Sequence, residues 1–203
     1  LFDVTGNTLD TLVLRSVASG NTLARDASGA WAEMKPSPGY DNTDAGAAAY
    51  EASLQGDEDI GVYINEFMAS NATILADAYG VYSDWIELYN SNGYEVDLSG
   101  FGLSDSLSQP KKYTLPEGTV IPANGYLVIF CSGNEGFTES GELHAPFSLR
   151  AYAEDVVLAG KRGTILDSYS YTVQETDYSM ARVPDGTGEF MQTAHPTPGY
   201  AND

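Results

Sequence analysis

Basic residues are scarce in this chain. Among its 203 residues, nine Lys and Arg stand against 29 Asp and Glu, which gives a formal net charge of -20. Such a field repels the phosphate backbone of nucleic acid and the headgroups of an anionic membrane, so neither is an expected partner. Strong acidity instead favours solubility and cation binding, and it is common in proteins that work outside the cell.

Cysteine and histidine are also rare, with one and two residues. Cys131 is the only cysteine, which excludes an intrachain disulfide and a cysteine-built metal site. It ends the most apolar run of the chain, residues 126–131, and is expected to be a small buried hydrophobe. His144 and His195 stand far apart with no paired acidic motif, so we expect surface histidines rather than a zinc site.

No apolar run approaches the roughly 20 residues that a membrane-spanning helix needs. The first residues carry neither a basic stretch nor a long apolar one, so no secretion signal is recognisable. Either a signal has been removed or the sequence is an excerpt of a longer protein. The internal repeat described below favours the excerpt.

Residues 84–90 (DWIELYN) are the most informative stretch. They alternate, they are rich in aromatic and branched side chains, and turn residues bound them. This pattern predicts a strand that ends in a tight turn. With a period of two, Ile86 and Leu88 face one way, while Trp85, Glu87 and Tyr89 face the other.

Further short strands are expected on both sides of this stretch. The first lies within residues 60–68, with Ile60, Val62, Ile64 and Glu66 on one side, and a long connection follows it over residues 71–83. The others are expected within residues 96–100, 101–105, 112–115, 126–131, 147–149, 155–159 and 165–171. Short strands separated by turn chemistry, without a long amphipathic helix, predict an all-β sandwich.

Two distant parts of the chain resemble each other. Residues 6–10 (GNTLD) match residues 163–167 (GTILD), and the same spacing pairs Leu23-Ala24-Arg25 with Met180-Ala181-Arg182. After a small insertion, residues 36–42 (PSPGYDN) match residues 196–202 (PTPGYAN). The ordered series predicts that residues 1–42 are the C-terminal part of a preceding repeat and residues 60–203 a complete one. Residues 43–59, alanine-rich and then acidic, are interpreted as a linker with at most a helical turn.

Eight short motifs in order carry a family resemblance. They are INEF (64–67), DWIELYN (84–90), VDLSG (96–100), LSD (103–105), LPEGT (115–119), GYLVI (125–129), RVPDG (182–186) and PTPG (196–199). Together they resemble the lamin-tail domain, in the version found in bacterial secreted and surface proteins. The resemblance covers about residues 60–202.

The resemblance implies an immunoglobulin-like β-sandwich. Bacterial domains of this type accompany extracellular enzymes and other modules, and they act as binding or spacing units. The family brings no catalytic residues, so none is carried over to this chain. The nucleic-acid contacts of nuclear lamin tails are not transferred either, because the charge of -20 opposes them.

Three groups of side chains are candidate sites. Glu66 and Glu87, on adjacent strands, could lie near the separation used by retaining glycosidases, but their place inside strands favours structural carboxylates. Tyr79 and Tyr82, in the long connection, could offer platforms to sugar rings, with sheet-face tyrosines as the alternative. Calcium is the cofactor to consider, because acidic residues cluster at 41–44 and 57–59, although solvated linker charge explains both clusters and neither fits an EF-hand.

The expected function is a non-catalytic structural or interaction module, extracellular or at the cell surface. Its partner is another protein or a cell-surface polysaccharide. The alternative is a carbohydrate- or calcium-binding accessory domain of a larger extracellular enzyme. Residues 1–42 lack the front of their own repeat, so we expect them to dock on a sheet edge, with self-association through a neighbouring molecule as the favoured form.

Overall fold

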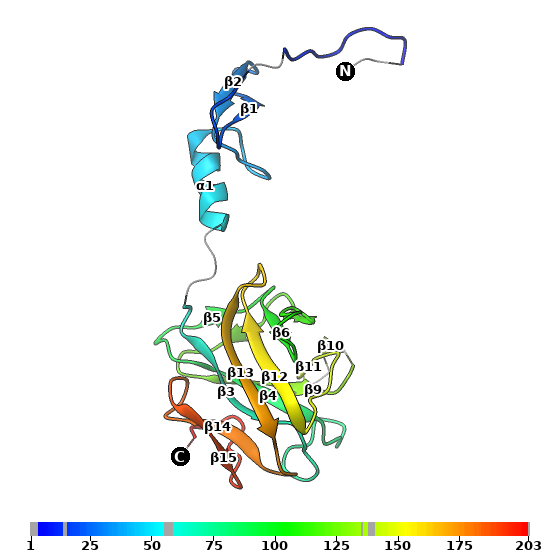
Figure 1. The fold of residues 1–203 in the computed structure, drawn as a ribbon, viewed down its shortest axis with the longest axis vertical. Helices are drawn as coiled ribbons and strands as arrows, with labels where there is room; N and C mark the ends of the chain where they lie inside the picture. The colour runs from blue at the N-terminus through cyan, green and yellow to red at the C-terminus, as the bar shows by residue number, and fades with distance from the viewer. Residues whose placement is uncertain (1–3, 14–15, 55–58, 135, 138–140, 203) are drawn as a thin grey trace. The chain divides into compact units, whose positions relative to one another are not determined.

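The computed structural model of the chain describes residues 4–13, 16–54, 59–134, 136–137 and 141–202. It divides into two compact units, Leu1–Gly56 and Asp57–Asp203. Each unit is described by itself (Figure 1).

The N-terminal unit contains a β-hairpin and a helix. Strands β1 (Thr22–Arg25) and β2 (Trp31–Met34) pair antiparallel, with Arg25 opposite Trp31. The helix α1 (Asp44–Leu54) occupies most of the segment interpreted from the sequence as a linker with at most a helical turn. Its alanines favour the helix, and Thr43 caps it by accepting the Gly46 N–H at 3.0 Å on its side-chain oxygen.

The C-terminal unit contains two main sheets. The larger has seven strands in the order β10-β11-β9-β4-β3-β14-β15. Their bounds are β3 (Val62–Met68), β4 (Asp84–Asn90), β9 (Tyr126–Cys131), β10 (Gly136–Phe137), β11 (Leu143–His144), β14 (Ser179–Val183) and β15 (Glu189–Thr193). Strand β4 lies at the centre, hydrogen-bonded to β3 on one side and to β9 on the other.

The second sheet has four strands in the order β13-β12-β6-β7. Their bounds are β6 (Gly102–Ser104), β7 (Tyr113–Thr114), β12 (Tyr152–Ala159) and β13 (Ile165–Val173), and a separate pair joins β5 (Val96–Asp97) to β8 (Val120–Ile121). In Figure 1 the long strands β12 and β13 cross in front of β3 and β4. The architecture is the all-β immunoglobulin-like β-sandwich predicted from the sequence.

The main core confirms the alternation of β4. Ile86 and Leu88 are fully buried in the cluster that fills the space between the sheets, with Leu103 and Leu158 of the second sheet. Trp85 is equally buried but faces the other way, against a smaller cluster that contains Met68 and Phe130. Strand β4 therefore carries buried side chains on both faces, as expected for the centre of a wide sheet.

The side predicted for Glu66 is wrong. Ile64 pairs with Leu88, but Glu66 pairs with Glu87, so Asn65 is an extra residue that forms a β-bulge. A bulge reverses the alternation beyond it. Ile64 consequently faces the main core, whereas Glu66 lies with Glu87 on the outer face of the seven-stranded sheet.

Several expected strands differ in detail. Residues 147–149 form no strand, although Phe147 and Leu149 are buried. The sequence of residues 11–14 (TLVL) also suggests a strand, but residues 11–13 form none, and Leu14 lies outside the described residues. Conversely, strands β14 and β15 were not predicted.

Candidate functional site

Two carboxylates lie buried side by side on the outer face of the large sheet. Glu66 on β3 and Glu87 on β4 are cross-strand partners, and neither side chain is exposed. A buried charge needs hydrogen bonds or a counter-ion to be tolerated. Both glutamates accept hydrogen bonds from residues 179–199, and Glu87 also accepts one from the bulge residue Asn65.

Glu66 accepts hydrogen bonds from β14 and from the segment after β15. The Ser179 hydroxyl donates to Oε1 at 2.5 Å, and the backbone N–H of Thr197 donates to both carboxylate oxygens at 3.2 and 3.1 Å. The Thr197 hydroxyl adds a fourth contact to Oε2 at 3.3 Å. The carboxylate thereby ties residue 197 to strand β3.

Glu87 fixes the next part of the same segment. The backbone N–H of Gly199 donates to Oε2 at 2.5 Å, and the Asn65 amide donates to Oε1 at 3.0 Å. Gly199 has a φ of 87°, a conformation that favours glycine. The bulge residue Asn65 is therefore a functional part of the arrangement, because its extra position aims an amide at Glu87.

Asp185 extends the network. It accepts hydrogen bonds from the Asn65 amide at 3.2 Å, from the Tyr126 hydroxyl at 2.5 Å and from the backbone N–H of Asn202 at 3.0 Å. The Asn202 amide in turn donates to the carbonyl of Arg182 at 3.0 Å. The network holds the C-terminal segment of residues 196–202 over the outer face of the sheet.

Burial dominates the electrostatics of the pair. Desolvation raises the pKa of Glu87 to about 8, and the hydrogen bonds from Asn65 and Gly199 only partly oppose it. Desolvation also raises the pKa of Glu66, against the hydrogen bonds from Ser179 and Thr197. Since no oxygen of either group faces solvent, the pair has the geometry of a structural anchor, not of an acid and nucleophile flanking a sugar.

The candidate tyrosines both belong to the connection between β3 and β4. Tyr79 is 68% exposed and Tyr82 is 46% exposed. Two side chains shape this loop: Asp77 accepts the backbone N–H of Tyr79 and of Val81 at 2.9 Å each, and Asn71 donates to the carbonyl of Ser83 at 2.7 Å. Two aromatic rings are thus presented to solvent from a fixed backbone.

The histidines have different environments. His144, expected at the surface, is buried, because β11 pairs with β9 and places the ring at 5.3 Å from that of Phe130. Its Nδ1 lies 2.9 Å from the Ser132 hydroxyl. His195 is exposed after β15. Cys131 is buried as predicted, and burial raises the pKa of its thiol.

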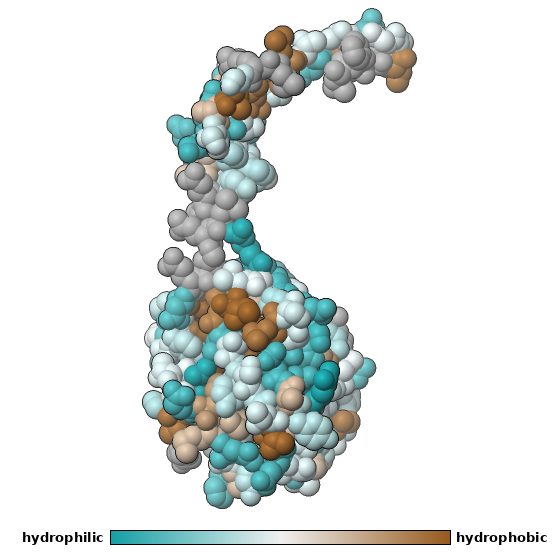
Figure 2. All heavy atoms as spheres, viewed as in Figure 1, coloured by the Kyte–Doolittle hydropathy of each residue, from teal (hydrophilic) through white to brown (hydrophobic). Residues whose placement is uncertain are grey.

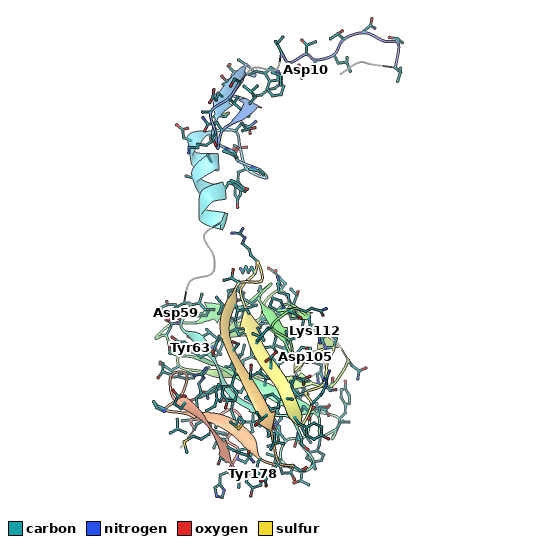
Figure 3. The ribbon with its side chains drawn as sticks, in the orientation of Figure 1. Asp10, Asp59, Tyr63, Asp105, Lys112 and Tyr178 are labelled. Carbon is teal, nitrogen blue, oxygen red and sulfur yellow. The ribbon has the colours of Figure 1, made fainter. Side chains whose placement is uncertain are left out.

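The structure describes only part of the acidic clusters considered for calcium. Asp57 and Glu58 lie outside the described residues. Asp59 accepts the Tyr63 hydroxyl at 3.1 Å and the Gly61 N–H at 2.9 Å (Figure 3). Among the residues that the structure describes, no group of three or more His, Cys, Asp or Glu side chains is placed to hold a metal ion.

The fold and the buried network define an immunoglobulin-like structural module. The family model of the lamin tail domain matches residues 58–173, more than half of the chain. This chain therefore belongs to the lamin tail domain family. A search of curated proteins found no match to it. Within the described part of the chain, no helix is long and apolar enough to cross a membrane.

The matched range ends before β14. The hairpin β14–β15 and the segment of residues 196–202, which supply most of the donors to Glu66 and Glu87, follow the match in sequence. Sequence reasoning favoured a structural role for the two glutamates but did not predict their hydrogen-bond partners. The signal that could have found them was the repeated PTPG motif, whose N–H groups and glycine suit a turn that approaches a carboxylate.

Proposed function

We propose that this chain is a non-catalytic interaction module of a secreted or surface-attached bacterial protein, and that the loop of residues 69–83 is its contact surface. The observation that carries the proposal is the group of large side chains that this ordered loop exposes: Ile74, Tyr79, Val81 and Tyr82. Side chains of this kind, held on a rigid backbone, bind with little loss of conformational entropy.

The surroundings of the loop support the proposal. On the face shown in Figure 2, hydrophobic residues appear in small separate groups among hydrophilic ones, so the sandwich presents no broad apolar face there. The net charge of -20 disfavours anionic partners. A neutral cell-surface polysaccharide or a protein with basic and apolar side chains fits this surface, and the tyrosine rings favour the accessory, carbohydrate-binding form of the function.

A glycan array, run with and without calcium, tests the proposal. We expect the chain to bind a neutral glycan, and Tyr79→Ala or Tyr82→Ala to weaken that binding about fivefold to thirtyfold, since a stacked aromatic ring contributes about 1–2 kcal/mol. Tyr94→Ala is the matched control, because Tyr94 is 66% exposed in a different loop. Calcium-dependent binding would instead support the calcium-dependent accessory function.

Thermal unfolding provides the second half of this test. All three tyrosines are exposed, so each alanine variant should keep its free energy of unfolding within about 0.5 kcal/mol of the wild type. A loss of binding at unchanged stability assigns the binding site to the loop of residues 69–83. Equal loss in the Tyr94 control, or binding that survives both loop substitutions, would contradict the assignment.

A further inference from the structure

Strands β1 and β2 repeat the C-terminal hairpin in three dimensions as well as in sequence. Arg25 pairs with Trp31 across the first hairpin, and Arg182 pairs with Phe190 across the second. Each arginine places its guanidinium over the aromatic ring of its partner, at 4.8 and 4.3 Å from the ring centroid. The same cation–π contact therefore stabilises both hairpins.

Two further contacts of each arginine correspond as well, to a carboxylate and to a glycine carbonyl. Arg25 donates to the carboxylate of Asp10 and to the carbonyl of Gly29. Arg182 donates to the carboxylate of Asp167 at 2.8 Å and to the carbonyl of Gly188 at 3.0 Å. Residues 10–34 thus reproduce the local network of residues 167–193.

The segments that follow the hairpins match in the same way. Ser37 donates to the Asn42 side chain at 3.1 Å, as Thr197 donates to the Asn202 side chain at 2.7 Å. The backbone N–H of Tyr40 closes on the Ser37 carbonyl at 2.9 Å, the same distance as between Tyr200 and Thr197.

The two intervening glycines also agree. The φ angles of Gly39 and Gly199 are 82° and 87°. The two turns therefore share the same local backbone conformation, which in the C-terminal unit presents the Thr197 and Gly199 N–H groups to the buried glutamates.

The C-terminal copy uses these groups to dock. Strand β14 pairs with the edge of β3, with Ala181 opposite Glu66. The Ser179 hydroxyl and the Thr197 N–H donate to Glu66, and the Gly199 N–H donates to Glu87.

The N-terminal copy carries the same groups around a hollow of about 310 Å³. Its lining includes Thr22, Ala24, Ser37, Gly39 and Asn42, which correspond to the residues at 179, 181, 197, 199 and 202. Within the described residues, the sheet of this unit consists of β1 and β2, so the edge of β1 that corresponds to the docked edge of β14 carries no strand. Three of these counterparts, Ser179, Thr197 and Gly199, are the residues that donate to Glu66 and Glu87 in the C-terminal copy.

We propose that residues 22–42 bind the edge strand and the paired buried glutamates of a lamin-tail sandwich that lacks its own C-terminal hairpin. A strand like β3 would add to β1, and its glutamate would enter the hollow and accept from the Thr22 hydroxyl and the Ser37 N–H. The sandwich of this chain is not the occupant, because β14 already covers its β3 edge and residues 179–199 already saturate its glutamates. The binding site is separate from the loop proposed above.

A transplant tests the fit. Residues 179–202 of the full chain are replaced by residues 22–42, and thermal unfolding is compared with that of the native chain and of a shortened chain, residues 57–178, which lacks both hairpins. We expect the transplant to unfold cooperatively, within about 10 °C of the native midpoint and well above the shortened chain. A transplant that melts no higher than the shortened chain would overturn the proposal.

Position 22 supplies the matched control within the transplant. Thr22→Val removes the hydroxyl at constant volume and should lower the midpoint by about 5 °C, because it leaves a buried carboxylate oxygen without its donor. Thr22→Ser restores the group found at residue 179 and should leave the midpoint unchanged. If valine and serine behave alike, the hollow does not receive a carboxylate.

Light scattering on the native chain identifies the occupant. Since the β3 edge of each copy is already covered, we expect a monomeric mass at all concentrations. A dimer that forms with increasing concentration and is lost on Thr22→Val would assign the site to a second copy and overturn the choice of partner. Mixed with residues 57–178, which lack both hairpins, the native chain should form a one-to-one complex.

Discussion

Removing residues 194–203 should destabilise the sandwich by about 3–5 kcal/mol and lower its melting temperature by about 10 °C. The deletion takes away the N–H groups of Thr197 and Gly199, so Glu66 and Glu87 both lose donors that the native chain provides. The cost is that of the hydrogen bonds to these two carboxyl groups that are no longer made. Differential scanning calorimetry on the two chains measures it.

A control and a rescue separate this cause from loss of packing. Tyr200 lies in the deleted segment and is 75% exposed, so Tyr200→Ala in the intact chain should change the stability by less than about 0.5 kcal/mol. In the shortened chain, measured at a pH above the Glu87 pKa of about 8, Glu66→Gln with Glu87→Gln should recover part of the loss, because a neutral amide is less costly to leave without donors than a carboxylate. If the shortened chain has the same melting temperature as the native chain, other donors must replace the hydrogen bonds that Glu66 and Glu87 lose.

The stability of the sandwich should fall as the pH rises from about 4.5 to 8. The folded state raises the pKa of Glu87 to about 8 from an ordinary value of 4.5, so between these values the native chain binds more protons than the unfolded one. The contribution is complete below pH 4.5 and is lost as the pH rises through 8. Its slope is at most about 1.4 kcal/mol per pH unit for one such group.

Urea unfolding at pH 5, 6.5 and 8 measures the slope. Burial raises the pKa of Asp84 to about 6 and that of Glu66 above its ordinary value, and both shifts have the same sign. Glu87→Gln is therefore the decisive variant, since it removes the carboxyl group whose pKa is raised to about 8 and should flatten the dependence between pH 6.5 and 8. A wild-type stability that increases over this range would refute the assignment of the raised pKa to Glu87.

The sequence was sufficient to predict the fold because its signal is local. The alternation of Ile86 and Leu88 against Trp85 on β4 follows from the period of a strand, and the structure has the same two faces. The position of Glu66 was not predictable in this way. One inserted residue, Asn65, reverses the alternation, and a bulge leaves little trace in hydrophobicity because Asn65 and Glu66 are both polar.

The partners of the glutamates were hidden for another reason. Backbone N–H groups of residues 197 and 199 carry no side-chain signature, and they reach Glu66 and Glu87 across separations of 131 and 112 residues. Strand β14, with Ser179 and Arg182, lacks the apolar alternation that identifies strands. Only the repeated PTPG motif indicated a specific local structure at residues 196–199. The motif did not indicate the strand on which that structure docks.

These long separations in sequence affect how the sandwich folds while the chain is being synthesised. Strands β3 and β4 leave the ribosome early, with carboxylates that remain hydrated until residues 179–199 arrive more than 110 residues later. Closing such large loops is slow, because their entropy must be lost before any contact is gained. The nascent sandwich should therefore stay open along the β3 edge through most of its synthesis, a period in which another hairpin with the same donors could occupy that edge first.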